Sequence, residues 1–409
     1  METSLYVAMV LAVVVMAASM LSVELGLSVA VIEICLGVAV GNTLHLPTPD
    51  WLVFLAGFGS VVLTFLAGAE VDPGELRQTW KASLLIGGFS FAAPFVGAML
   101  ACRYGFGWDW KAAQIGGTAL STTSLAVVYA VLVESGLNAT RIGKLIMSST
   151  FVTDMGTVLA LSVLFITPSW WLAPFVLISL LLIVVMPRLE EWFFRRYGSR
   201  VIEPEIKGAF AALLVLMWLG SKAHSQAVLP AFLLGLALSR TFARHHALQQ
   251  RFRVVAFALL TPFFFIRSGM NVSLPLVMAN LGLLVALLAV KLVFKALAVY
   301  PLARRYAPGH SMFTTLLMST GLTFGTISAT YGYTAGIITR AQFSVLVTVV
   351  VLTAVVPTAV AQRFFSPDAA ADDLARPVTA AGPGDPAEQG ARDQAELSWT
   401  ARQDSSEMP

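Results

Sequence analysis

Asp154 is the residue of this sequence whose chemical type is hardest to explain by packing alone. It lies in a long apolar stretch, ten residues after Lys144. If that stretch is a membrane helix beginning near Lys144, a rise of about 1.5 Å per residue puts the carboxylate about 15 Å deep, close to the middle of the bilayer. A charged group at that depth costs about 2.5–3.5 kcal/mol or more, so it indicates a functional site.

Hydroxyl-bearing and small residues flank Asp154, from Ser148 to Thr157. Their oxygen atoms can serve as cation ligands beside the carboxylate, and their small size lets another helix approach closely. The competing interpretation is a structural aspartate that is protonated or hydrogen-bonded to a backbone group. The cost of burying a charge favours the functional interpretation.

Two lysines, Lys291 and Lys295, lie one helical turn apart in a second apolar stretch. Lys291 precedes Pro301 by ten residues, and we take Pro301 as the end of that helix, so we expect Lys291 at a depth similar to that of Asp154. Lys295 lies close enough to this end to extend to the interface, so Lys291 is the better candidate for a charge partner of the aspartate. The alternative is that both lysines extend past lipid to the surface.

Two apolar stretches are interrupted half-way by glycine and hydroxyl residues, at 116–124 and at 319–326. Non-helical backbone at membrane depth is tolerated only where it lines a cavity or is buried in protein. Ser and Thr can also bond to their own helix without breaking it, so either segment alone is a weak signal. Each segment lies in the middle member of a trio of helices, however, and the two trios begin on opposite sides. Together they predict an inverted repeat with two broken helices.

Membrane helices must position these residues. The chain has 409 residues, of which 57% are hydrophobic and 12% charged, whereas about a quarter of a soluble domain is charged. Apolar stretches of about 20 residues, enough to span a bilayer, recur as far as Phe365. The first is followed directly by another, so we interpret it as a membrane helix and not as a signal peptide. We predict thirteen transmembrane helices, approximately at residues 4–22, 28–44, 52–71, 81–102, 112–134, 140–166, 170–187, 207–222, 226–243, 254–269, 276–301, 311–332 and 341–362.

The distribution of Lys and Arg predicts the orientation of these helices. The loops after odd-numbered helices, together with the C-terminal flank, hold sixteen basic residues, and the loops after even-numbered helices hold four. Basic loops are retained on the cytoplasmic side. We therefore predict an all-α polytopic protein of the cell's inner (plasma) membrane, with its N-terminus outside and its C-terminus cytoplasmic.

Two segments are predicted to lie outside the membrane. Residues 188–206 alternate aromatic with charged side chains, which is typical of an amphipathic helix at the interface, and we expect them to link two halves of a transmembrane domain at residues 1–365. Residues 366–409 hold nine acids and three arginines and scarcely any aromatic residue, which predicts a disordered acidic cytoplasmic tail. No glycine-rich phosphate loop follows a strand, and the only two cysteines lie in apolar stretches. We expect no cofactor, no resident metal and no nucleic-acid partner.

Other charges in the apolar stretches are less informative. Glu33, Glu70 and Glu134 lie near the ends of their predicted helices, where they can be solvated or can bond to neighbouring helices. Arg267 can line an outer vestibule, pair with an acid or extend to the surface, and the sequence does not choose among these.

Several short segments carry a resemblance to a known family when they are taken in order. The chain resembles the monovalent cation:proton antiporter-2 family, the bacterial sodium/proton and Kef-type potassium/proton exchangers. The resemblance extends from the first predicted helix to the thirteenth. The matching segments are Val31–Gly37, Phe65–Pro73, Ser121–Ser124, Glu134–Gly136, Thr153–Asp154 and Pro262–Phe265 with Gly269.

This resemblance implies the sodium/proton antiporter fold, in which a six-helix core slides against a dimerisation domain and two broken helices cross beside a carboxylate. By position, Asp154 matches the ion-binding aspartate of the family. Thr123 and Ser124, with Thr122 before them, match the unwound stretch of the first broken helix. Lys291 matches the lysine that pairs with the acid in some members.

Thr153 departs from the family pattern. Sodium exchangers of this kind usually have Asp or Asn before the key aspartate, and the potassium branch has Gln. A threonine hydroxyl can bind a cation but carries no charge, so Thr153 joins the predicted ion-binding residues while the preferred cation and the charge moved per cycle stay open.

Together these residues predict a secondary transporter rather than an enzyme. It exchanges a monovalent cation, with Na⁺ favoured, for protons, because Asp154 can hold one or the other. Potassium/proton exchange of the Kef type is the near alternative, and an organic-anion symporter of the same fold and a non-transporting sensor are further ones. An intramembrane protease would need two membrane-embedded aspartates or a Ser/His pair, whereas Asp154 is the only aspartate in the middle of a predicted helix. The expected partners are the transported ions, the bilayer and a second copy of the chain.

Overall fold

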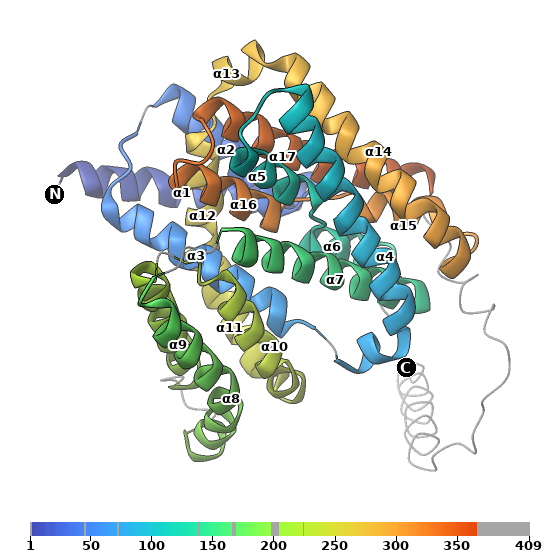
Figure 1. The fold of residues 1–409 in the computed structure, drawn as a ribbon. Coiled ribbons are helices and arrows are strands. Elements are labelled where there is room, and N and C mark those ends of the chain that lie inside the picture. Colours follow the sequence, from blue (N-terminus) through green and yellow to red (C-terminus); the bar gives the residue numbers. More distant parts are fainter. Residues whose placement is uncertain are drawn as a thin grey trace, which may run out of the picture. The chain divides into compact units, whose positions relative to one another are not determined.

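The structure, a computed structural model, is almost entirely helical over the part of the chain that it describes (Figure 1). The described residues are 2–44, 46–71, 73–137, 140–165, 169–197, 204–223 and 225–365. The helices, with two π-helical turns named η1 and η2, are α1 (Glu2–Leu25), α2 (Val29–Thr43), α3 (Asp50–Ala69), α4 (Pro73–Leu100), η1 (Ala101–Gly105), α5 (Trp110–Ser121), α6 (Leu125–Glu134), α7 (Arg141–Leu164), α8 (Leu172–Tyr197), α9 (Pro204–Lys222), α10 (Val228–Arg244), α11 (His246–Val255), η2 (Ala256–Leu260), α12 (Thr261–Asn271), α13 (Leu274–Ala279), α14 (Leu281–Tyr306), α15 (Ser311–Met318), α16 (Thr323–Thr334) and α17 (Arg340–Phe364).

The composition of these helices is that of a membrane protein. Within the described ranges, nine helical segments are long and apolar enough to cross a bilayer. The predicted all-α membrane class is therefore confirmed. Each of the thirteen predicted stretches overlaps a helix or a pair of half-helices, but the number of membrane crossings stays a prediction.

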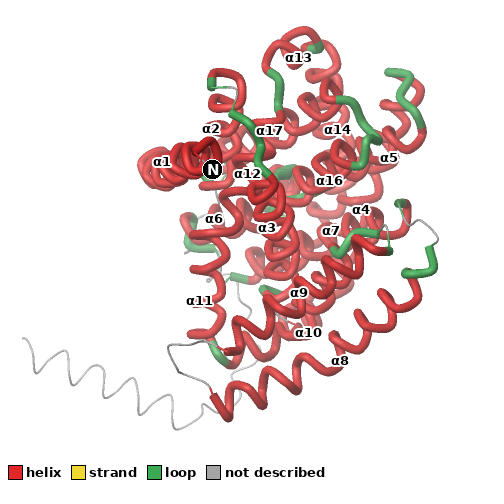
Figure 2. The backbone as a smooth tube through the Cα atoms, turned by 90° about the vertical axis from the view of Figure 1, so that its left-hand side faces the viewer, coloured by secondary structure: helices red, strands yellow, loops and turns green. Residues whose placement is uncertain are grey.

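The helices pack in two groups. The panel group contains α1, α2, α3 and α8 to α12, among which α10 packs along α3 and α12 along α2. The crossing group contains α4 to α7 and α14 to α17, among which α4 packs on α5, α7 and α14. In Figure 1, α8 and α9 lie at the lower left and α4 and α14 at the right, and Figure 2 gives the view after a quarter turn.

The crossing group repeats one pattern. A long helix, α4 or α14, is followed by a broken helix, α5/α6 or α15/α16, and then by another long helix, α7 or α17. Hydroxyl residues begin the last member of each trio, since Thr140 Oγ1 accepts a hydrogen bond from the Gly143 amide and Thr339 forms a capping box with Gln342. The predicted broken helices are thus present, each in the middle of its trio.

Glycines bring the panel helices into backbone contact. Gly235 of α10 lies directly against the carbonyl oxygen of Phe65 in α3, and Gly269 of α12 lies against that of Ile34 in α2. Lipid gives no hydrophobic drive for helix association, so close van der Waals packing at small residues holds such pairs together.

Several helix boundaries differ from the prediction, among them the start of α4 at Pro73 and the division of the stretch at 276–301 into α13 and α14. Two further differences concern the predicted linker and the buried lysines. α8 continues through Pro187 to Tyr197, so the first part of the expected linker at 188–206 is the end of a long helix. Residues 198–203 of that linker, and the whole predicted tail at 366–409, lie outside the described residues. α14 continues through Pro301 to Tyr306, five residues further than expected, because a proline inside a membrane helix is tolerated when neighbouring groups satisfy the freed carbonyl.

Replacing Gly235 with alanine tests the panel packing. The new Cβ would collide with the Phe65 carbonyl, so we expect Gly235→Ala to lower the free energy of unfolding by about 1–3 kcal/mol, as overpacking does. Gly88→Ala is the matched control, since nothing lies within 4 Å of a Cβ at that position of α4. Unfolding in detergent measures both, and equal stability of the two variants would contradict the close contact.

Candidate exchange site at the crossing of two broken helices

The breaks in α5/α6 and α15/α16 meet each other. Thr123 Oγ1 donates a hydrogen bond to the Met318 carbonyl oxygen at 3.0 Å, and the Ser124 amide donates to Thr320 Oγ1 at 3.3 Å. Thr122 and Ser124 have extended backbone, which leaves helix-terminal groups of α5 and α6 without partners in their own helix. The two breaks are separated by about half the chain, so the crossing is made by tertiary packing.

Asp154 faces this crossing from α7. Its side chain is 2% exposed. Thr150, one helical turn earlier on the same face, lies 3.6 Å from the sulfur of Met318, the last residue of α15. Asp154 Oδ1 has no hydrogen-bond partner among the described residues. A buried carboxylate oxygen without a donor is open to a proton or to a cation.

The hydroxyls of the unwound stretch differ in what they bond. Thr123 donates to the second broken helix, as described above, and Thr122 Oγ1 donates to the Ala119 carbonyl oxygen at 3.1 Å. Ser124 Oγ is buried and has no partner among the described residues. Ser124 therefore provides the second unsatisfied oxygen at the crossing.

Thr153 is directed to α4 instead. Its hydroxyl lies 3.2 Å from the Gly87 carbonyl oxygen and 3.1 Å from that of Ser149. Of the predicted ion-binding residues, the structure brings Asp154, Thr122, Thr123 and Ser124 to the crossing, whereas the Thr153 hydroxyl is bonded to backbone away from it.

Both lysines of α14 are fully buried. Lys295 Nζ donates to Ser90 Oγ at 2.8 Å and to Thr123 Oγ1 at 2.9 Å, and it interacts electrostatically with Asp154. Lys291 Nζ donates to Thr353 Oγ1 of α17 at 3.0 Å and lies against Gly321 in the second break. Lys295 thus bonds to the first broken helix, and Lys291 bonds to α17 and lies beside the break in the second broken helix.

Lys295 is the residue that the sequence reasoning missed. The expectation that it extends to the interface is wrong because α14 does not end at Pro301. Its last residue is Tyr306, eleven residues after Lys295, which corresponds to a depth of about 16 Å. The available signal was the spacing of four residues, which puts both lysines on one face.

The remaining charges lie away from this cluster. Glu70 pairs with Arg253 at 3.4 Å, joining the end of α3 to α11. Burial raises the pKa of the Glu70 carboxyl, and the Arg253 guanidinium opposes that shift. Glu33 is buried in α2, and the Glu134 side chain lies outside the described part. The described residues contain no group of three His, Cys, Asp or Glu side chains that could hold a metal ion.

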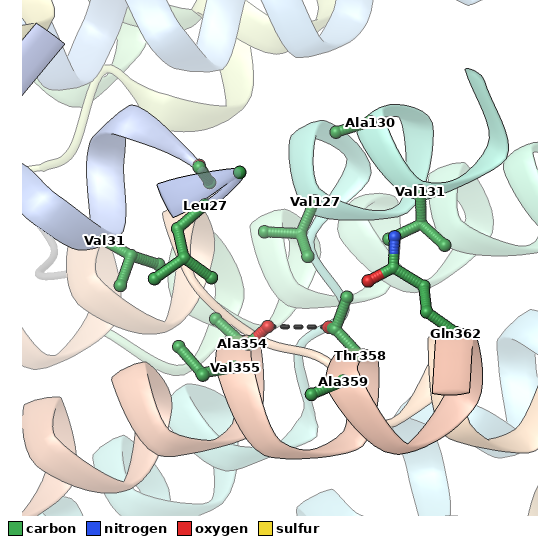
Figure 3. Close-up of a pocket in the computed structure, with 12 residues that line it drawn as sticks. Leu27, Val31, Val127, Ala130, Val131, Ala354, Val355, Thr358, Ala359 and Gln362 are labelled. Carbon is green, nitrogen blue, oxygen red and sulfur yellow. Dashed lines mark hydrogen bonds between the residues drawn. The ribbon is translucent and has the colours of Figure 1, made fainter. Parts of the chain in front are cut away.

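A cavity of about 60 Å³ opens beside the half-helix α6 (Figure 3). Its walls come from the start of α2, from α6 and from the C-terminal half of α17, so it lies between the panel and crossing groups. Thr358 and Gln362 are polar groups of its wall, and Val127 and Val131 belong to the half-helix that follows the first break. A small cavity therefore lies between the two groups at this end of the molecule.

A family comparison assigns this architecture. The family described as "Sodium/hydrogen exchanger, transmembrane" matches residues 9–365. The chain belongs to this exchanger family. Its membership of the antiporter-2 branch stays a prediction, because the match concerns the exchanger family as a whole.

Individual relatives agree with the family. The chain is 27% identical over 340 residues to a probable Na(+)/H(+) antiporter 3 of Methanocaldococcus jannaschii, covering 78% of this chain and 85% of that protein. It is 23% identical over 350 residues to the Na(+)/H(+)-K(+) antiporter GerN of Bacillus cereus, covering 82% and 89%. The fold is similar to that of the sodium proton antiporter MjNhaP1 of M. jannaschii, with a TM-score of 0.66 at 11% identity over 88% of this chain and 98% of that one. The predicted antiporter fold is confirmed.

Thr123 can be tested as the connection between the lysine and both broken helices. We expect Thr123→Val to lower the free energy of unfolding by about 1–3 kcal/mol, because it leaves the Met318 carbonyl and one Lys295 donor unsatisfied in a buried place. Thr118→Val is the control, since that buried hydroxyl bonds only within α5, to the Gln114 carbonyl. Thermal unfolding in detergent compares the two, and a Thr118→Val loss as large as that of Thr123→Val would mean that the crossing bonds add nothing.

Proposed function

We propose that this protein exchanges a monovalent cation, Na⁺ in preference, for protons, and that Asp154 binds both. The observation that carries the proposal is the buried carboxylate oxygen of Asp154 at the crossing of two broken helices, which receives no hydrogen bond from any described residue. A buried carboxylate is stable either as the neutral acid or beside a positive charge. Cation and proton therefore compete for it, and exchange follows if the crossing group moves only when Asp154 is occupied.

Thr122, Thr123 and Ser124 are the proposed oxygen ligands on the first broken helix, with Ser124 Oγ the one that has no other partner. Thr153 contributes to the site by holding α7 against α4, or it becomes a cation ligand if its hydroxyl turns away from the Gly87 carbonyl. Potassium/proton exchange is the second candidate, and it is supported by the similarity to a relative named as a Na(+)/H(+)-K(+) antiporter. Membership of the antiporter-2 branch belongs to the same proposal, since a lysine coupled to the aspartate is what that resemblance implies.

Lys295 is the proposed charge partner in place of Lys291. Its ammonium interacts with Asp154, whereas Lys291 bonds to α17. When a cation occupies the aspartate, Lys295 is left buried beside an additional positive charge, and loss of its proton relieves the repulsion. Two protons would then exchange for one cation.

The proposed orientation follows the basic loops, with the N-terminus outside and the C-terminus cytoplasmic in the cell's inner membrane. The cavity beside α6 then faces the cytoplasm, and the ends of α12 and α16 face outward. A homodimer, implied by the resemblance, stays a prediction.

Asp154→Asn tests the site. The change keeps the side-chain volume and removes the titrating charge, so we expect a folded protein whose Na⁺-driven proton movement falls to the level of protein-free liposomes. A pH-sensitive dye in proteoliposomes measures this after the addition of Na⁺ or K⁺. Asp109→Asn, in an exposed position before α5, is the control. Normal exchange by the Asp154→Asn protein would refute the assignment.

An imposed membrane voltage tests the role of Lys295. Asp154 alone exchanges one proton for one cation and moves no net charge, whereas participation of Lys295 moves one charge per cycle. We expect voltage to drive exchange in the wild type and in Lys291→Gln, and to have no effect in Lys295→Gln. If voltage has no effect on the wild type, the stoichiometry is one to one and both lysines are structural.

A further inference from the structure

We propose that ions reach the crossing from the outer side along one face of α16, and that Arg267 sets the access of cations to that route by its charge. The face consists of Thr323, Thr326, Thr330 and Thr334, which we call the threonine stripe. The proposal rests on exchange at Asp154 and on the orientation given above.

The threonine stripe runs the length of the half-helix α16. Its members are spaced by three or four residues, so they lie on one side of the helix. Thr334 at the outer end is exposed, Thr330 is half-buried, Thr326 is fully buried, and Thr323 beside the break is half-buried. Polar atoms therefore follow one another from the surface to the second break, and Thr326 is the most buried of them.

The hydroxyl of Thr326 has no hydrogen-bond partner in the part of the chain that the structure describes. Buried hydroxyls in helices normally donate to a carbonyl one turn earlier, and Ser328, two residues further on α16, does so to Phe324 at 2.7 Å. Thr326 Oγ1 is buried and makes no hydrogen bond to any described residue. An unpaired buried hydroxyl is unfavourable, and a water molecule or a cation passing along the stripe would satisfy it.

Arg267 borders the stripe from α12. The neighbouring Ser268 Oγ lies 3.2 Å from Thr330 Oγ1, which puts α12 against the stripe. Arg267 Nε is buried without a hydrogen-bond partner among the described residues. The guanidinium is near Tyr333 of α16. A fixed positive charge at the mouth of a narrow route lowers the local concentration of cations.

Hydrogen bonds join α12 to its neighbours near the outer end of the route. Arg340 of α17 donates to the Asn271 carbonyl at 3.1 Å, and the Ser273 amide donates to Ser344 Oγ at 2.9 Å, so α17 is joined to the segment that follows α12. The opposite end has the cavity between α2, α6 and α17 (Figure 3). Opening the stripe requires α12 to separate from α16 and α17.

Cysteine accessibility tests the route. Thr326→Cys and Ser328→Cys lie on opposite faces of one half-helix and are made in a Cys35→Ala, Cys102→Ala background. The probe is a cationic, membrane-impermeant methanethiosulfonate, applied with Na⁺ on both sides. We expect outer labelling of T326C and none of S328C, with V127C labelled only from the opposite side. Labelling of S328C but not of T326C, or of both equally, would overturn the route.

A disulfide tests the closure. In the same background, the pair Ser268→Cys and Thr330→Cys lies close enough to be joined. Oxidation should abolish exchange, and reduction of the same sample should restore it. The single variants Ser268→Cys and Thr330→Cys, treated with the same oxidant, should keep exchange, because neither can form the cross-link. Continued exchange in the oxidised S268C/T330C protein would exclude separation of α12 from α16.

The charge of Arg267 is expected to affect the apparent KM for Na⁺ on the outer side only. In Arg267→Gln we expect the apparent KM for outer Na⁺ to fall about two- to fivefold at low ionic strength, with a smaller difference at high salt and no change for inner Na⁺. Arg103→Gln is the control on the same predicted side. An unchanged or raised outer KM would exclude this role. Asp154→Asn separates the exchange site from the outer route. Continued exchange in this variant would refute the site at Asp154, whereas labelling of T326C tests the route independently.

Discussion

Backbone groups freed where a membrane helix breaks must find partners inside the membrane, and the arrangement of the crossing group depends on this constraint. The breaks at Thr122–Ser124 and at Ser319–Leu322 satisfy part of it by bonding to each other. Two half-helix ends can meet in this way only if the two trios of helices pack together. The crossing therefore fixes how α4 and α7 lie relative to α14 and α17, and with them the side chains that those helices carry.

Three ionisable side chains, Asp154, Lys291 and Lys295, lie near the crossing. The surrounding hydroxyl groups bond to the two lysines but not to Asp154 Oδ1 among the described residues. Ser90 and Thr123 hold Lys295, and Thr353 holds Lys291, so both ammonium groups have fixed partners. Asp154 has one oxygen, Oδ1, to which no described residue donates a hydrogen bond. Buried charges are stable only with compensation, so the carboxylate is the member of the cluster whose partner can change, and this is the property that an exchange site needs.

The contacts between the two helix groups are unequal at their two ends. Beside α6 the groups are separated by a cavity, whereas at the ends of α12 and α16 they are joined by polar contacts. Glycines bring helices into backbone contact within both groups, since Gly87 of α4 lies against the Ser149 carbonyl of α7 as Gly235 of α10 lies against that of Phe65. Each group is therefore closely packed within itself, and the difference between the two ends lies in the contacts between the groups.

The sequence by itself determined the membrane class, the approximate helix positions, the two breaks and the burial of Asp154, because hydropathy and the cost of buried charge act through local composition. The role of Asp154 in exchange stays a prediction. The short segments of the sequence also indicated an exchanger family. Only the tertiary structure decided that Lys295 is close enough to Asp154 for an electrostatic interaction and that Lys291 bonds to α17. It also decided that Thr153 bonds to α4 and that Thr326 Oγ1 has no partner among the described residues. The reason is that depth along a helix follows from residue number, whereas the direction of a side chain and the partner it meets depend on which helices pack beside it. Pro301 shows the limit on depth too, since neighbours in the bundle allow α14 to continue past it.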